Sequence, residues 1–270
     1  MSEAVSEQIA TGEYDAEGAA VTVALELEAD MFRFRGDNVA LTVAGVTLSG
    51  SFAVERFTET STQFDPTSGQ LSFMESSVTV LAISDFSVDL GPVKLEDGNG
   101  VFVVGGGGFA GEASVRVSVP GSDQFSFSGT FGLAFNTTSE AVNRRVTVGG
   151  ESVSLVLPEG PYIRVSGTNV QLNVFGQSLS GNFSLERLVD DNGSTLIRGG
   201  MSGVNVFLGT GAGTDDEQGF RISEGRGAML ITDAGVALEA GGAIALVGFD
   251  SLSLTAEQMT VQVNTMSEAV

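Results

Sequence analysis

Residues 33–56 read RFRGDNVALTVAGVTLSGSFAVER, and residues 164–187 read RVSGTNVQLNVFGQSLSGNFSLER. The two stretches lie 131 positions apart, and 13 of their 24 positions are identical without a gap. Weaker matches join the rest of the two halves, with length differences concentrated in residues 57–82 and 210–219. The chain therefore contains two copies of one unit, and its differences in length are expected to fall in connections between strands.

The boundary between the copies follows from a second repeated phrase. NTTSEAV at 136–142 returns as NTMSEAV at 264–270. We place the first unit at 1–142 and the second at 143–270, and we interpret residues 1–5, MSEAV, as the tail of a preceding unit. The expected context is a longer tandem array, and the alternative is a complete protein of two units.

The hydrophobic pattern inside each unit has a period of two. Val21, Val23, Leu25 and Leu27 alternate with Thr22, Ala24, Glu26 and Glu28, which is the pattern of a strand with one apolar face. Clusters of Gly, Asn, Asp and Ser interrupt such runs every 8–12 residues, a spacing that is typical of hairpins and meanders. Short strands that follow a predicted turn recur six times, at 34–41, 83–90, 119–127, 165–172, 201–208 and 247–254. Each unit thus comprises three β subrepeats.

This pattern predicts an all-β fold. The only helical candidate is one short turn at 138–145, with Thr137 and Glu140 spaced as a capping box. Because the junction between the units carries no Pro-rich or Ser-rich linker, we expect a continuous structure, either an elongated meander or a β-solenoid-like stack. Two β-sandwich modules in series are the alternative.

Composition excludes several classes of function. The 270 residues include 34 acidic and 12 basic side chains, for a formal net charge of −22, and no Cys, His or Trp. A field of this sign repels nucleic acid and anionic lipid, and no run of residues is apolar enough to insert into a membrane. Without imidazole or thiolate, the usual nucleophilic triads are excluded, and we expect no enzyme activity.

One resemblance adds context to this pattern. The stretch VNRRVTVGGESVSLVLPEGPYIRVSGTNVQLNVFGQSLSGNFSLER at 142–187 and the phrase FNTTSEAV at 135–142 resemble the tandem repeat regions of very large secreted bacterial surface proteins. Those regions are Gly-rich, acidic, Cys-free and β-rich. The resemblance covers both units and implies an extracellular or cell-surface stalk or adhesive array. It implies no catalytic residues.

Acidic turns are the candidate metal sites. The phrases EDGNG, VDDNGS and TDDEQG each gather carboxylate or amide oxygens, which calcium prefers as ligands. None of them forms a complete EF-hand loop, and solvated hairpin turns are the alternative interpretation. The candidate calcium ligands are Glu96, Asp97, Asn99, Asp190, Asp191, Asn192, Asp215 and Asp216. No other cofactor is expected.

Charged and aromatic residues recur at the same places in both copies. Glu55–Arg56 and Glu186–Arg187 occupy equivalent positions, as do Arg33 and Arg164, which suggests a repeated structural ion pair near a strand end. Phe52 and Phe183 are also equivalent, and both are expected in the core.

The sequence therefore favours a non-catalytic structural or adhesive β-repeat module of a long extracellular protein. Its expected partner is itself, through head-to-tail contacts that build a fibre. The alternative is a calcium-dependent or carbohydrate-binding adhesion module with a surface glycan or protein receptor, although only Tyr14 and Tyr162 supply aromatic polar groups for a glycan. A polysaccharide-active β-helix enzyme is a third interpretation.

Overall fold

The computed structural model describes residues 3–27, 29, 31–43, 45–65, 70–105, 107–122, 125–148, 151–189 and 193–267. Within these residues every regular element is a β-strand, which confirms the predicted all-β class. The eight strands of the first half are β1 (Val5–Tyr14), β2 (Ala20–Leu27), β3 (Phe32–Val43), β4 (Val46–Asp65), β5 (Gln70–Asp89), β6 (Lys94–Gly105), β7 (Gly108–Ser122) and β8 (Phe125–Asn136). The eight of the second half are β9 (Val142–Val148), β10 (Glu151–Leu157), β11 (Tyr162–Val174), β12 (Gln177–Val189), β13 (Thr195–Thr210), β14 (Gln218–Thr232), β15 (Gly235–Val247) and β16 (Thr255–Asn264).

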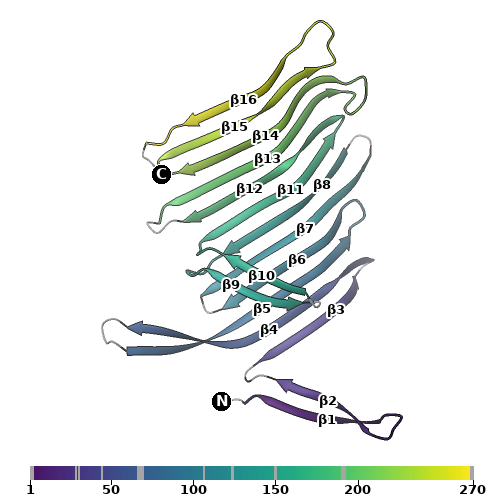
Figure 1. The fold of residues 1–270 in the computed structure, drawn as a ribbon, viewed down its shortest axis with the longest axis vertical. Helices are drawn as coiled ribbons and strands as arrows, with labels where there is room; N and C mark the ends of the chain where they lie inside the picture. Colours follow the sequence, from purple (N-terminus) through teal and green to yellow (C-terminus); the bar gives the residue numbers. More distant parts are fainter. Residues whose placement is uncertain are drawn as a thin grey trace.

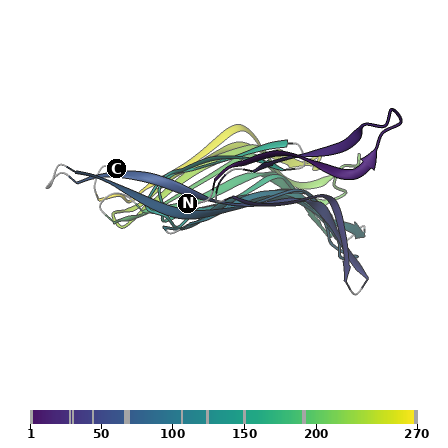
Figure 2. The same cartoon turned by 90° about the horizontal axis from the view of Figure 1, so that it is seen from below.

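Twelve of these strands form one open antiparallel sheet (Figure 1). Its order is β3-β4-β5-β6-β7-β8-β11-β12-β13-β14-β15-β16, so neighbours in sequence are neighbours in space except where β8 pairs with β11. Seen from below, the sheet is a thin, bent layer (Figure 2). The elongated meander predicted from the sequence is therefore the observed architecture, and β3 and β16 are its two edge strands.

The strand order repeats once along the chain. A two-stranded hairpin, β1–β2, precedes the six strands β3 to β8, and a second hairpin, β9–β10, precedes the six strands β11 to β16. The pairing of β3 with β4 has the same register as that of β11 with β12. Gly36 faces Phe52 as Gly167 faces Phe183, and each register shifts just beyond that pair.

The length differences between the copies fall where strands turn back. β4 and β5 are 20 residues each, whereas their counterparts β12 and β13 have 13 and 16. The insertion at 57–82 thus lengthens one hairpin, which extends beyond the side of the sheet (Figure 1). The insertion at 210–219 falls at the connection between β13 and β14.

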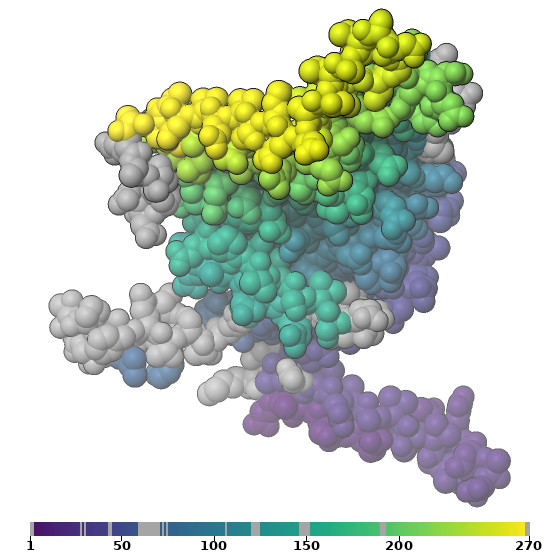
Figure 3. All heavy atoms as spheres, turned by 45° about the horizontal axis from the view of Figure 1, so that its top comes forward, coloured from purple at the N-terminus to yellow at the C-terminus, as the bar shows by residue number. Residues whose placement is uncertain are grey.

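The two hairpins have different surroundings. β9–β10 lies across one face of strands β4 to β8 (Figure 1) and covers the main core cluster, in which Leu155 is fully buried and Leu157 is 3% exposed. β1–β2 pairs with no strand of the large sheet, and it projects from the body of the molecule (Figure 3). Every residue of β1 is exposed.

Four of the six recurrent turn motifs are not turns between strands. At 34–41, 83–90, 165–172 and 201–208 the chain continues through a β-bulge inside one long strand. The bulge residues adopt positive φ, as Asn38, Asp85, Asn169 and Gly203 show. Asn, Asp and Gly tolerate this conformation both in turns and in bulges, so the residue types were interpreted correctly but their role was not. The motifs at 119–127 and 247–254 do span connections.

The predicted helical turn at 138–145 is wrong. Thr137 bonds to Phe109 instead of capping a helix, with its amide and its hydroxyl both donating to the Phe109 carbonyl at 2.9 Å. β9 begins at Val142, within the predicted turn. Pairing between strands at this junction overrides a weak local helix signal.

Candidate functional site

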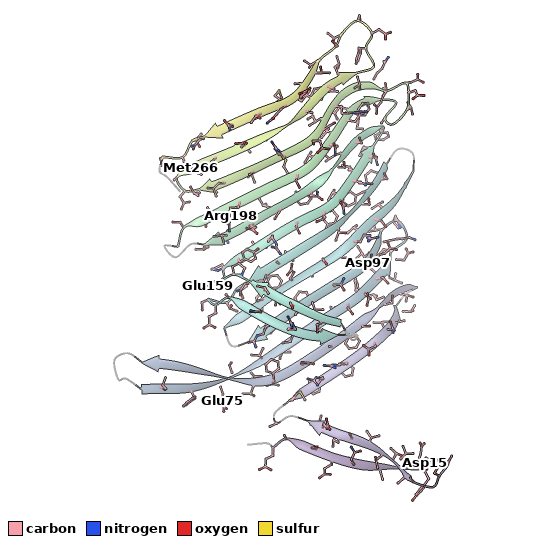
Figure 4. All side chains as sticks on the ribbon, viewed as in Figure 1. Asp15, Glu75, Asp97, Glu159, Arg198 and Met266 are labelled. Carbon is pink, nitrogen blue, oxygen red and sulfur yellow. The ribbon has the colours of Figure 1, made fainter. Side chains whose placement is uncertain are left out.

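The first group of predicted calcium ligands lies inside β6 and not in a turn. Asp97 is the positive-φ residue of a bulge, and its carboxylate pairs with the guanidinium of Arg116 at 3.1 Å. Asn99 joins two bulges, because its Nδ2 donates to the Asp97 carbonyl at 2.8 Å and its Oδ1 accepts from the Asp85 amide at 3.5 Å. Glu96 faces Arg116 across the strand pair. Figure 4 shows Asp97 near one end of the strands.

The second copy uses the same device with different residues. Asn205 donates to the Gly203 carbonyl at 2.9 Å and accepts from the Glu224 amide at 3.3 Å. Each unit thus uses asparagine to link neighbouring bulges, which assigns Asn99 a structural role. The spacing of Asp97 from Asn99 and of Gly203 from Asn205 is the signal in the sequence that identifies this device.

The remaining predicted ligands are not brought together with β6. Asp215 and Asp216 lie exposed in the β13–β14 connection, where the Asp216 amide bonds to the hydroxyl of Thr214. Asp190, Asp191 and Asn192 lie outside the described residues. Among the residues that the structure places, no three acidic side chains gather closely enough to hold a metal ion.

The repeated arginine and glutamate contact each other in the first copy, but in the second copy each of them contacts a different partner. Arg33 and Arg35 both contact Glu55 Oε1 at 2.7 Å. In the second copy Arg164 faces Glu186 but pairs with Glu112 at 3.0 Å. The Arg164 side chain therefore reaches across β8, whose Ala134 at that position is small and buried. Glu186 contacts Arg198 at 3.5 Å instead.

Tyr162 is part of the same network and is not available to a glycan. The residue is 7% exposed, and its hydroxyl donates to Glu186 Oε1 at 3.3 Å. Burial raises the pKa of Tyr162 above its ordinary value, and the neighbouring Arg164 opposes that effect only in part.

The sheet has two chemically distinct faces. The polar face carries the ion pairs and the seat of hairpin β9–β10, and every strand residue of the large sheet in the core cluster lies on it. The opposite face, which we call the apolar face, carries the row Phe34, Val54, Leu81, Phe102, Gly111, Phe135 and Ile163 across β3 to β11. Large side chains exposed on it include Phe34, Leu41, Phe109, Leu133, Ile163, Val165, Leu179, Phe183, Leu185, Met201, Leu208, Met259, Val261 and Val263.

Phe52 and Phe183 share the apolar face but do not form a core. Phe52 is half-buried and Phe183 is 41% exposed, so the expectation of two buried rings is wrong. The two rings do occupy equivalent positions, each opposite a glycine of the neighbouring strand. What the repeat could not show is that no core cluster of the described residues covers the face that carries them.

Glycines on the apolar face provide space for neighbouring rings. A Cβ added at Gly36 would lie 2.9 Å from the ring of Phe52, and one added at Gly167 would lie closer still to Phe183. Phe131 also approaches Phe183, with ring centroids 6.3 Å apart. The rings thus lie flat over neighbouring strands and cover backbone that would otherwise face solvent.

The junction between the two units is a strand pair. β8 of the first unit and β11 of the second pair antiparallel, with Leu133 facing Val165 and Phe131 facing Gly167. The apolar face is continuous across this pair. The strands equivalent to β8 and β11 at the ends of the sheet are β16 and β3, and each has one edge that pairs with no described strand.

The chain matches no protein-family model, no curated protein and no solved structure. No helix in the described parts of the chain is long and apolar enough to cross a membrane.

Proposed function

We propose that this chain is a structural β-repeat module that joins further copies end to end, with β16 of one copy pairing with β3 of the next. The observation that supports it is the β8–β11 junction, where one unit already continues the sheet of the other. Edge strands offer rows of unpaired N–H and C=O groups, and they recruit other chains unless they are protected.

The side chains at the two edges are suited to this contact. Phe34 on β3 is equivalent to Val165, and Val261 on β16 is equivalent to Leu133, which faces Val165. Phe34 is 54% exposed and Val261 is 51% exposed. Pairing in the register of β8–β11 would bring these two side chains directly opposite each other on the apolar face. Such a head-to-tail contact is heterologous and propagates as a filament unless it closes a ring.

The proposed role is non-catalytic and adhesive or supporting, in a fibre at or outside the cell surface. The resemblance to repeat regions of large secreted bacterial surface proteins supports that location. The net charge of −22 supports the proposed fibre as well, because charges of one sign make separate fibres repel each other. Backbone hydrogen bonds at the strand edges act at short range and can still form.

Sedimentation over a range of protein concentrations tests this proposal. The unaltered chain is expected to form oligomers, and Phe34→Glu or Val261→Glu is expected to reduce them, because each places a carboxylate at the proposed contact. Leu185→Glu on the central strand β12 is the matched control, since Leu185 is 44% exposed on the same face. A monomer at all concentrations would contradict the proposal. Equal loss in all three variants would also contradict it, because association would then depend on the apolar face as a whole and not on the two edge strands.

A further inference from the structure

The outward-projecting hairpin β1–β2 is a near copy of the seated hairpin β9–β10. Val142 faces Leu157 and Arg144 faces Leu155 in β9–β10. Val5 faces Leu27 and Glu7 faces Leu25 in β1–β2. The two hairpins therefore have the same pairing register at these positions. Leu25 of β1–β2 therefore occupies the place of Leu155, the fully buried residue that holds β9–β10 on the sheet.

One side of β1–β2 is consequently mostly apolar, and most of its side chains are exposed. It carries Val5, Ile9, Val23, Leu25 and Leu27 together with the charged Glu7, and Ile9 is 48% and Val23 is 58% exposed. The other side carries Ser6, Gln8, Thr22, Ala24 and Glu26. A two-stranded hairpin of this kind is marginally stable alone and requires a surface to pack on.

The second unit repeats the seat on which β9–β10 lies. In the first unit one row across β4 to β8 reads Glu55, Val80, Val103, Ala110 and Asn136. In the second unit the equivalent row across β12 to β16 reads Glu186, Arg198, Leu230, Ala237 and Asn264. No described strand covers the second row, which we call the open seat.

The row in the second unit is more exposed than the row in the first unit, as expected if it lacks a hairpin that covers it. Ala110 is 2% exposed and Asn136 is fully buried, whereas Ala237 is half-buried and Asn264 is exposed. Leu230 is half-buried and lies in a depression that Arg198, Ala237 and Asn264 also line.

The chain leaves both seats by the same path. After β8, the Thr137 amide donates to the Phe109 carbonyl at 2.9 Å, and after β16 the Thr265 amide donates to the Val236 carbonyl at 2.8 Å. The Thr138 amide bonds to Asn136 Oδ1 at 2.9 Å, and the Met266 amide bonds to Asn264 Oδ1 at 3.0 Å. Figure 4 shows Met266 just beyond β16. The open seat is thus formed to the same plan as the occupied one.

We propose that hairpin β1–β2 of one copy packs on the open seat of another copy, as β9–β10 packs on the first unit. This inference rests on the proposed end-to-end function and identifies a second contact at the same junction. It places the hairpin over the strands next to the β16–β3 pair. Two copies would then contact each other both through paired edge strands and through the hairpin packed on the polar face.

A change of charge at the contact is consistent with this partner. The open seat has Arg198 where the occupied seat has Val80, and the incoming hairpin has Glu7 where β9 has Arg144. Relative to the occupied seat, the open seat therefore gains the positive charge of Arg198. Relative to β9–β10, the side of β1–β2 that would face the open seat gains the negative charge of Glu7. Opposite charges across an interface favour the correct partner.

The association constant of full-length variants, measured by sedimentation, tests this proposal. Leu25→Asp is expected to weaken end-to-end association by about tenfold or more, because it would place a carboxylate in the apolar contact. Ala24→Asp is the matched control, since it adds the same charge to the other side of the same strand, and its association is expected to equal that of the unaltered chain. Leu230→Asp is expected to weaken association from the side of the seat.

The outcomes separate the two proposals. If the unaltered chain associates and Leu25→Asp associates as well as Ala24→Asp does, the hairpin contact is wrong and the edge contact stands. If the unaltered chain stays monomeric, both proposals are wrong. Because β1–β2 pairs with no strand of the large sheet, Leu25→Asp is expected to leave the melting temperature of the monomer unchanged. A lowered value would show that the hairpin packs within its own chain.

Discussion

Tyr162 carries a clear pH signature at the residue scale. Burial raises its pKa in the folded state, so the folded chain keeps the phenol proton at a pH where the unfolded chain, with an ordinary pKa near 10, loses it. The stability that neutral Tyr162 contributes is complete below about pH 10 and falls as the pH rises above that value. In the Tyr14→Phe variant, Tyr162 is the sole tyrosine, and absorbance titration is expected to show a midpoint above 10. A midpoint that is the same in folded and unfolded protein would contradict this.

The acidic residues give a second prediction at this scale. Asp97 is paired with Arg116, Asn99 bonds to two bulges, and no three acidic side chains of the described residues gather closely enough to hold a metal ion. We expect calcium and magnesium chloride at equal concentration to raise the melting temperature alike, because both screen the self-repulsion of a strongly acidic chain. A larger shift with calcium would indicate a specific site, since magnesium tolerates only tight octahedral geometry.

At the scale of elements, hairpin β9–β10 stabilises the only large core cluster in the described chain. Leu155→Ala is expected to lower the free energy of unfolding by about 2–5 kcal/mol, as buried leucine truncations do. Val156→Ala on the same strand points the other way and is 65% exposed, so its effect is expected to stay within about 0.5 kcal/mol. Urea denaturation measures both. Similar losses in the two variants would show that β10 does not pack on the sheet.

The elements also show how far the sequence could be interpreted. Period-two alternation correctly predicted the strands, and the repeat of 33–56 at 164–187 correctly predicted two hairpins of one register. Asn38 and Asn169 were interpreted as turn residues because positive φ serves a turn and a bulge equally well. Only the pairing of the strand on both sides of the bulge separates the two, and pairing is a long-range property.

The candidate site was harder to predict for a related reason. The repeat made Phe52 and Phe183 equivalent, but whether the face that carries them is covered depends on where a distant hairpin lies. β9–β10 packs on the polar face, over Val80 and Val101, and leaves the rings uncovered. Likewise EDGNG was interpreted as a ligand-bearing turn, although its Asn99 bonds to backbone of two neighbouring strands.

At the scale of the whole molecule, the apolar face is the dominant surface. Twelve strands at about 4.8 Å spacing make it about 53 Å across from the first strand to the last. The largest apolar patch on an ordinary monomer covers only about 300–600 Å². The folded chain is therefore expected to bind an environment-sensitive apolar dye, and Leu185→Lys is expected to reduce the fluorescence. Dye fluorescence no greater than that of an ordinary soluble protein would show that this face is covered in solution.

The central claim is that copies join through β16 and β3 in the register of β8 and β11, and disulfide cross-linking tests it most directly. The chain has no cysteine, so Phe34→Cys with Val261→Cys introduces only the intended pair. Directly opposed side chains in an antiparallel pair have Cβ atoms about 4.5–5.5 Å apart, which is close to the spacing that a disulfide needs. Mild oxidation is expected to give a ladder of covalent oligomers. Phe34→Cys with Thr260→Cys, which places the two thiols on opposite faces, is expected to give none. The absence of a ladder in the first variant, or equal ladders in both, would contradict the claim.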